Sequence, residues 1–296
     1  MMRILLFLGT NLAIIVVASL TLNLLGVNSY LTANGLDLGS LLAFCAVFGF
    51  AGALVSLLLS KFMAKMSTRT QIIKQPSNAE ELWLIETVAE LAHKAGIGMP
   101  EVGIFPSNAS NAFATGWNRN NALVAVSAGL LTRFRKEEIR AVLAHEVGHV
   151  ANGDMVTLAL IQGVINTFVM FLARIVGYAV DSFLRRGDNS GGVGIGFYIA
   201  TFIAEVIFAV LASVIVAWFS RRREFRADEA GADLASKDAM ISALQRLQSE
   251  SMAHQQELSG ELTAFGISSI KKQGFMALLS SHPPLDERIS ALKNRV

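Results

Sequence analysis

The chain has 296 residues, of which 53% are hydrophobic and only 16% are charged, and its formal net charge is +2. Soluble domains carry about 25% charged residues, so this deficit excludes an ordinary soluble protein if the apolar residues cluster. The small net charge gives no basis for nucleic-acid binding, and the single cysteine, Cys45, excludes an internal disulfide.

Two apolar segments, residues 4–25 and 38–59, open the chain. Each is close to the ~20 residues that cross a bilayer, and the first is longer than the ~7–15-residue core of a cleavable signal peptide. Positive charge collects on the cytoplasmic side of membranes. Four basic residues follow the second segment: Lys61, Lys65, Arg69 and Lys74. We therefore predict that residues 1–60 form a transmembrane hairpin with both ends in the cytoplasm.

Residues 61–154 have the pattern of a globular α+β domain. Apolar residues at helical spacing predict a helix over 79–94, which Gly96 ends. A second helix is predicted over 136–150, ended by Asn152-Gly153-Asp154. Between them lie three strand-like runs, separated by Asn, Ser and Gly, at residues 101–105, 112–115 and 122–126.

A second apolar pair occupies residues 155–219, and we expect it to cross the membrane twice. Arg185 and Arg186 in its connecting loop oppose the charge bias of a loop outside the cytoplasm. Packing on the globular domain, or partial insertion in the interface, is therefore the alternative to spanning. Arg174 and Glu205 lie within the two segments and predict an ion pair across this hairpin.

Residues 220–296 predict the second part of the globular domain. Helices are expected over 224–234, 237–251 and 285–293, with little pattern over 252–273. Arg221, Arg222 and Arg223 precede the first of these helices. They could anchor the chain to anionic lipid or orient the acidic residue that follows, and anchoring is favoured for at least two of them.

The most informative motif is Ala144-His145-Glu146-Val147-Gly148-His149. Two His at positions i and i+4 project from one face of a helix, so both imidazoles can reach the same ion. Zinc accepts neutral imidazole and prefers four ligands in a tetrahedron. Glu146 falls beside the metal and can move a proton from water to a leaving amine. The pattern is a metalloprotease signature, and Glu146→Gln is predicted to bind zinc without cutting.

A catalytic zinc needs a third protein ligand and an open position. Glu224 is the best candidate, because it follows the second apolar pair on the same side of the membrane as His145. Asp228, four residues on, could accept the N–H of a ligating His and fix its tautomer. The alternative is an exposed acidic pair in a charged helix. His93 and His254 are expected to be ordinary polar-face residues.

In their order along the chain, these motifs resemble the HtpX-type membrane zinc metalloproteases, relatives of the CAAX prenyl proteases. The resemblance covers essentially the whole chain. It includes the apolar hairpin, the segment Ser110-Asn111-Ala112-Phe113-Ala114-Thr115-Gly116, the motif helix with His145 and His149, the second apolar pair, the Glu224–Asp228 motif, and the late His282-Pro283.

The resemblance implies roles for individual residues. His145, His149 and Glu224 match the family's zinc ligands, Glu146 the general base, and Asp228 the acid that orients a ligating His. The segment 111–115 resembles an edge strand that lines the cleft and pairs with an extended substrate. Asn111 could bond the substrate backbone or be an ordinary turn residue. His282 could donate to the oxyanion, gate the open metal position, or lie at the surface.

The expected fold class is a mainly α integral membrane protein. It combines transmembrane helices with a gluzincin-like α+β protease domain that has a small edge-strand sheet and the motif helix. The expected function is a zinc endopeptidase with one Zn²⁺ per chain. It would cleave membrane or misfolded proteins at the cytoplasmic face of a bacterial inner membrane, in quality control and the stress response.

Expected partners are protein substrates, the lipid bilayer and other membrane quality-control proteases. The alternatives are a protease that processes prenylated proteins and a transporter or channel that uses Arg174 and Glu205 around a structural zinc.

Overall fold

The computed structural model describes residues 2–26, 30–32, 35–185, 193–264 and 282–295, and the side chains of residues 2–11, 32 and 253–264 are outside this description. The chain divides into two compact units. The helical unit contains Met1–Leu59 and Thr157–Val216. The α+β unit contains Ser60–Val156 and Ala217–Val296. Each unit is therefore assembled from two separate stretches of chain.

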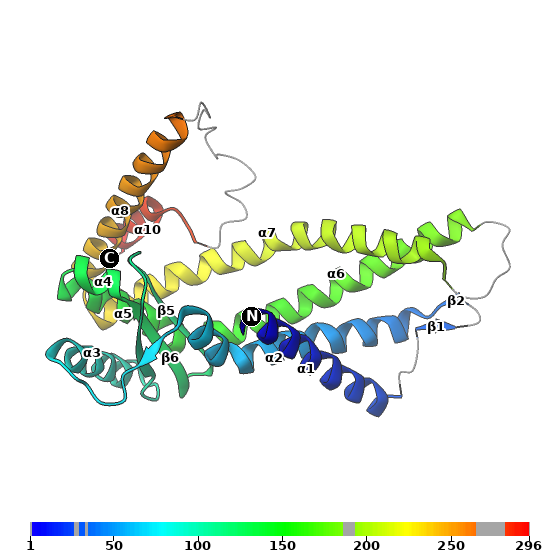
Figure 1. Ribbon diagram of the computed structural model, residues 1–296, viewed down its shortest axis with the longest axis horizontal. Coiled ribbons are helices and arrows are strands. Elements are labelled where there is room, and N and C mark those ends of the chain that lie inside the picture. The colour runs from blue at the N-terminus through cyan, green and yellow to red at the C-terminus, as the bar shows by residue number, and fades with distance from the viewer. Residues whose placement is uncertain (1, 27–29, 33–34, 186–192, 265–281, 296) are drawn as a thin grey trace. The chain divides into compact units, whose positions relative to one another are not determined.

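Four long helices supply the helical unit (Figure 1): α1 (Met2–Leu24), α2 (Leu38–Thr68), α6 (Asp154–Leu184) and α7 (Ile195–Leu234). In the part of the chain that the structure describes, α2, α6 and α7 are long and apolar enough to cross a membrane. The described apolar stretch of α1, Leu12–Leu24, is shorter. Large apolar side chains on α7 point outward, for example Phe202 with 67% of its surface exposed. Hydrocarbon contact, rather than water, suits such a surface.

Small residues and one ion pair fix the packing within the helical unit. At Gly49 of α2, an added Cβ would lie 2.8 Å from the carbonyl oxygen of Gly163 on α6, so the two backbones approach closely. Arg174 of α6 lies 2.9 Å from Glu205 of α7. The predicted ion pair across this hairpin is confirmed. Two short strands, β1 (Leu31–Thr32) and β2 (Gly35–Leu36), pair in the α1–α2 connection, where no strand was expected.

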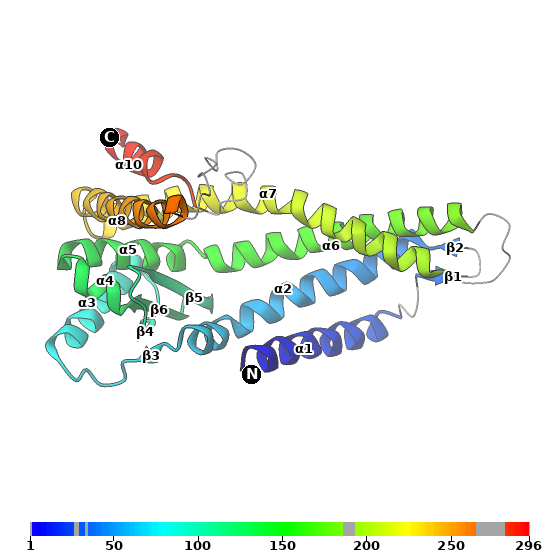
Figure 2. The same ribbon diagram turned by 45° about the horizontal axis from the view of Figure 1, so that its top comes forward.

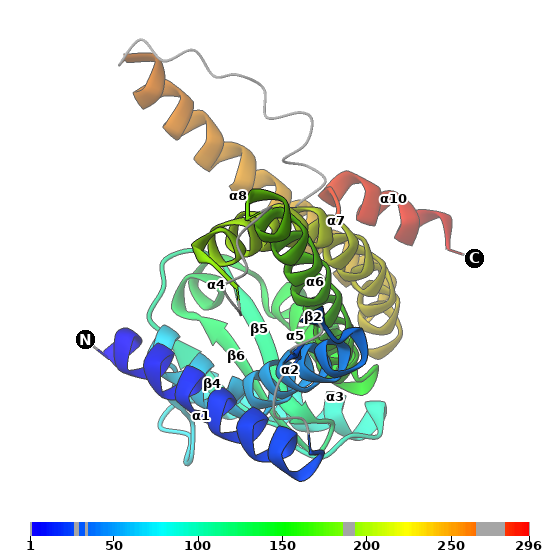
Figure 3. The ribbon, with the colours of Figure 1, turned by 90° about the vertical axis from the view of Figure 1, so that its right-hand side faces the viewer.

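The α+β unit contains a four-stranded sheet in the order β3-β4-β6-β5. Its strands are β3 (Gln71–Ile72), β4 (Glu101–Phe105), β5 (Ala112–Asn118) and β6 (Asn121–Ser127). β4 and β6 are parallel, and the other two pairs are antiparallel. Figure 3 shows β4, β6 and β5 side by side in this order. β5 therefore forms an edge, as the family resemblance implies for residues 111–115.

The helices that contact this sheet are α3 (Ala79–Ala95), α4 (Ala128–Arg133) and α5 (Lys136–Ala151). Beyond α5 lies α8 (Lys237–Ala264), and α10 (Leu285–Asn294) packs on α8 (Figure 2). The helix that carries the His-Glu motif, α5, contacts α3, α8 and β5. Leu143 and Val147 on α5 are fully buried, as are Leu84 of α3 and Leu244 of α8. A helix held on several sides gives its polar residues a fixed position.

The structure confirms the expected fold class and corrects several element bounds. Residues 224–234 are not a separate helix, because α7 continues without a break from its apolar part into the Glu224–Asp228 motif. The expected helix over 237–251 continues to Ala264. The rest of the segment with little pattern, 265–273, lies outside the described residues. β3 and α4 were not expected, because two-residue strands and one-turn helices leave almost no periodic signal.

Candidate metal centre

Two imidazoles and one carboxylate converge in the α+β unit. His145 and His149 lie one turn apart on α5, with ring centroids 4.7 Å apart and ring planes nearly perpendicular. Glu224 lies on α7, beyond its apolar part, and is only 4% exposed. Its Oε2 is 3.8 Å from Nε2 of His145, and its Oε1 is 3.4 Å from Nε2 of His149. One donor atom from each of the three residues lies within 4.8 Å of the others.

These separations fit a small tetrahedral cation. Two ligand atoms that each lie about 2.0–2.1 Å from one zinc ion, at a tetrahedral angle, are separated by about 3.4 Å. The two observed nitrogen–oxygen distances, 3.4 and 3.8 Å, are close to this value. Two imidazoles and one carboxylate also form one of the donor sets of catalytic zinc sites, in which the fourth position stays open.

Carboxylates orient both imidazoles. Oδ1 of Asp228 lies 2.9 Å from Nδ1 of His145, and Oδ2 of Asp154 lies 2.7 Å from Nδ1 of His149. Each Nδ1–H can donate to its carboxylate, which leaves the Nε2 lone pair directed toward Glu224. The sequence predicts this role for Asp228, whereas its pattern at Asp154 indicates only the end of a helix. The signal that could have identified Asp154 is its position five residues after His149, across the turn at Gly153 (φ 68°).

Arg288 on α10 also belongs to the site, and the sequence analysis missed it. Its guanidinium donates to both oxygens of Asp228, at 2.7 and 2.5 Å, and lies 3.3 Å from Oε2 of Glu224. The Arg288 side chain is buried, so this pairing occurs away from water. A bidentate contact of this kind fixes both orientation and charge. Nothing in the local sequence around Arg288 indicates a partner 60 residues earlier.

Burial and hydrogen bonds set the protonation of the metal-free cluster. Burial lowers the pKa of His149, but hydrogen bonds to Asp154 and Glu224 outweigh it and raise that pKa to about 9. Burial raises the pKa of Glu224, yet hydrogen bonds from His149 and His282 keep it far below the usual range. At neutral pH, His149 therefore carries a proton that a bound cation would replace.

The remaining candidates line one cavity of about 140 Å³ beside the triad. Glu146 is half-buried there, next to His145. Nδ1 of His282 lies 2.8 Å from Oε2 of Glu224. Asn111 is exposed at the start of the edge strand, where its backbone N–H donates to Oγ of Ser127 at 3.0 Å. The structure thus brings Glu146, His282 and Asn111 to the triad.

His93 and the three arginines before Glu224 do not line this cavity. His93 is exposed on α3 and does not line the cavity, and the side chain of His254 is outside the described residues. Arg223 donates to the backbone carbonyl of Asp154 at 3.1 Å, so it contacts the residue that orients His149. Arg222 lies over the ring of Trp218 at 5.1 Å.

The fold and the site together define a membrane-anchored metallopeptidase, because apolar helices long enough to span are combined with a buried His-His-Glu cluster and an adjacent glutamate. The chain belongs to Peptidase family M48, whose family model matches residues 78–296.

Full-length relatives carry the same name. The chain is 66% identical to "Protease HtpX" of Hahella chejuensis over 292 residues, which cover 99% of each chain. It is 65% identical to "Protease HtpX" of Alcanivorax borkumensis over 297 residues, which cover 100% of this chain and 99% of the relative. The resemblance expected from the motifs is therefore confirmed.

A solved structure has the same fold. The crystal structure of S. mikatae Ste24p superposes with a TM-score of 0.63 at 20% sequence identity, and the match covers 85% of this chain. The chain spans 58% of the Ste24p chain.

Proposed function

We propose that this metallopeptidase holds one zinc ion per chain on His145, His149 and Glu224, and that it cleaves peptide bonds at this site. The observation that carries the proposal is the opposed orientation of the two imidazoles. Nδ1 of each faces a carboxylate at 2.9 or 2.7 Å, and Nε2 of each faces Glu224. A zinc ion bound there supplies Lewis acidity, which lowers the pKa of a water molecule to about 7.

The protein's own side chains handle the proton and the substrate. Glu146 takes a proton from the attacking water and delivers it to the leaving nitrogen, since it lies next to a ligand in the cavity. His282 donates to the carbonyl oxygen as negative charge develops on it. The substrate backbone pairs with the free edge of β5, and Asn111 at the start of this strand holds the peptide in register. Asp228 and Asp154 keep the two imidazoles in the ligating tautomer.

The site faces the cytoplasm of a bacterial inner membrane in this proposal. Residues 1–60 and 155–219 form the membrane part, and residues 61–154 and 220–296 form the protease domain. The cluster of Lys61, Lys65, Arg69 and Lys74 after the first hairpin supports a cytoplasmic position for the domain.

The substrates of the proposal are membrane proteins and misfolded chains, cleaved in quality control and in response to stress alongside other membrane proteases. The support is that one chain carries both the site and helices long enough to cross a membrane, together with the relatives' shared name.

The catalytic proposal is tested with purified wild type and Glu146→Gln in detergent. An amide cannot accept the proton, so cleavage of an unfolded protein is expected to fall by about 10²–10⁴-fold while zinc stays near one per chain. Glu137→Gln is the matched control, because Glu137 is exposed on the same helix and does not line the cavity. Cleavage by Glu146→Gln above a tenth of the wild-type rate would contradict the assigned role.

The topology is tested with one engineered cysteine. In a Cys45→Ala background, Glu137→Cys places a thiol on the exposed face of α5. A membrane-impermeant maleimide added to intact spheroplasts is expected to leave it unlabelled and to label it after lysis. Labelling before lysis would place the protease domain outside the cytoplasm.

A further inference from the structure

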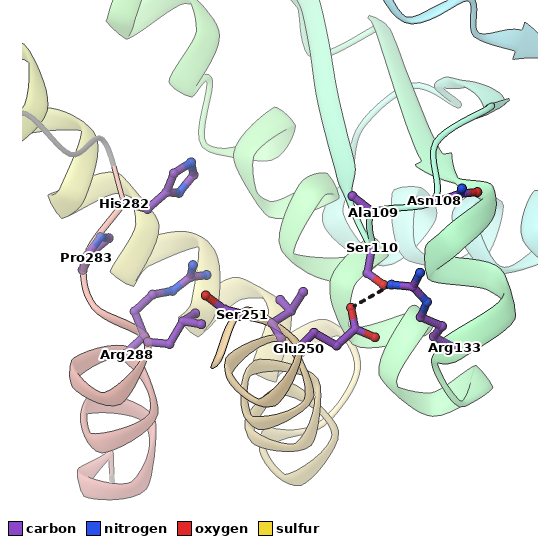
Figure 4. Close-up of a pocket in the computed structure, with 11 residues that line it drawn as sticks. Asn108, Ala109, Ser110, Arg133, Glu250, Ser251, His282, Pro283 and Arg288 are labelled. Atoms are coloured by element: carbon purple, nitrogen blue, oxygen red, sulfur yellow. Dashed lines mark ion pairs between the residues drawn. The ribbon is translucent and has the colours of Figure 1, made fainter. Parts of the chain in front are cut away.

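A second and larger cavity, of about 560 Å³, lies beside the metal centre within the α+β unit. Figure 4 shows residues of the 108–110 loop, α4, α8 and the start of α10 around it. Four of its lining residues also line the cavity of the triad: Ser110, Leu247, His282 and Arg288. The two cavities are therefore neighbouring spaces of one cleft, and a bound peptide can occupy both.

The wall of the larger cavity is mainly apolar. Ala109, Leu247, Pro283 and Leu285 supply hydrocarbon surface. Such a surface stabilises an apolar guest by about 25 cal/mol for each Å² removed from water. The volume falls in the ~300–1,000 Å³ range of pockets that enclose whole ligands. It is ample for a leucine, phenylalanine or methionine side chain.

The charged groups of this wall have partners of opposite sign. Arg133 of α4 faces Glu250 of α8, with nitrogen and oxygen 3.7 Å apart, as the dashed line in Figure 4 marks. Arg288 is committed to Asp228. A charged side chain would lose its hydration on entering and would have to displace one of these partners. The free-energy cost of this desolvation exceeds the gain from the new ion pair.

The loop that enters the edge strand runs from one cavity to the other. Asn108, Ala109 and Ser110 line the larger cavity, and the next residues, Asn111 and Ala112, line the cavity of the triad. A peptide that pairs with β5 advances about 3.4 Å per residue. A peptide with its scissile carbonyl at the triad, extended past the first residue of β5, places its next residues beside the 108–110 loop and the larger cavity.

We propose that the larger cavity is the subsite that selects a bulky apolar side chain next to the scissile bond. The proposal rests on the proposed protease function and names the substrate feature that the site recognises. Leu247 and Leu285 are its specificity-determining apolar contacts, and the Arg133–Glu250 pair is part of its wall. One or more buried methylene groups change kcat/KM by about 10–200-fold in such pockets.

The test compares wild type with a variant in which the cavity is filled. Ser251 lines the cavity from α8, and Ser251→Trp places an indole in it. Met252→Trp is the matched control, since Met252 is 56% exposed and does not line the cavity. Full-length proteins in detergent cut two peptides that differ only in having Leu or Ala at the flanking position. The position itself is identified by mass-spectrometric mapping of cuts in an unfolded protein.

Wild type and Met252→Trp are expected to prefer the Leu peptide by at least about 10-fold in kcat/KM. Ser251→Trp is expected to lose this preference because cutting of the Leu peptide falls, with the Ala peptide cut within about 3-fold of wild type. Ala109→Phe fills the cavity from the opposite loop and is expected to act in the same way, so the test does not depend on one variant folding.

Two results would overturn the inference. One is a wild-type cleavage map without enrichment of bulky apolar residues at a flanking position. The other is an unchanged Leu preference in both filled variants. If wild type binds zinc and cuts without preference, the subsite alone is wrong, whereas no cutting by wild type overturns the proposed protease function as well.

Discussion

Asp154→Asn tests whether the orientation of His149 controls metal affinity. Asp154 is 1% exposed and accepts from Nδ1 of His149 at 2.7 Å. Its other oxygen lies 3.4 Å from Arg226, whose side chain is 57% exposed. The amide keeps the shape of the carboxylate but accepts only a neutral hydrogen bond, which has about half the strength of a charge-assisted one. The substitution therefore weakens the support of one ligand and leaves the ligand itself in place.

The expected cost is a 10–100-fold loss of zinc affinity, which is the effect of removing a residue that orients a ligating His. This factor corresponds to about 1.4–2.8 kcal/mol of binding free energy. Little loss of folding stability is expected in the zinc-loaded protein, because His149 is then a neutral ligand and the charge left without its partner, Arg226, is mostly in water.

The assay is a competition titration of zinc between the metal-free protein and a chelating dye. Arg226→Ala is the control, since it removes the exposed partner of Asp154 and leaves the contact with His149. It is expected to bind zinc within about twofold of wild type. If Asp154→Asn also binds within threefold of wild type, the argument that Asp154 holds His149 in its ligating tautomer is refuted.

Three further predictions concern pH, the buried Arg288–Asp228 pair and the partly buried Arg174–Glu205 pair. The pKa of His149 in the metal-free protein is about 9, so zinc displaces one proton when it binds. Zinc affinity is therefore expected to rise about tenfold per pH unit from pH 6 to 8. A zinc affinity that does not change over this pH range would contradict the prediction. Arg288→Ala leaves buried Asp228 without its bidentate partner, so the free energy of unfolding is expected to fall by about 3–5 kcal/mol in denaturant unfolding. A fall below about 1 kcal/mol would count against this prediction. Replacing Arg174 by Met and Glu205 by Gln together is expected to leave kcat/KM within twofold of wild type; a large loss of cleavage would give this pair a role in the reaction.

The sequence predicts the elements that have a strong local signal. The helices at 79–95 and 136–151 begin where predicted and end within one residue of the predicted position, because capping residues and apolar spacing act over a few positions. Asn78 accepts from the backbone of Glu81, and Gly96 ends the helix in the left-handed region. The spacing of His145 and His149 likewise predicts their common face without any tertiary information.

The parts of the site that the sequence analysis missed depend on long-range contacts. Arg288 reaches Asp228 from a helix 60 residues later in the chain. Asp154 begins a long apolar helix, where an acidic residue is ordinarily read as a cap. The continuity of α7 through Glu224 was also missed, because the change from apolar to charged residues at Arg221 resembles the end of a helix. Tertiary packing, rather than local composition, decides whether such a helix continues and which side chains meet.

The ligand set is tested most directly by zinc-edge X-ray absorption on zinc-loaded protein. Glu146→Gln is the sample of choice, because it is expected to bind zinc without cleaving protein. Two imidazole nitrogens and oxygen donors at about 2.0–2.1 Å are expected. One imidazole is expected when His149→Ala is added, and loss of tight binding when Glu224→Ala is added. An unchanged imidazole count in the His149→Ala protein, or full zinc affinity without Glu224, would contradict the proposed metal centre.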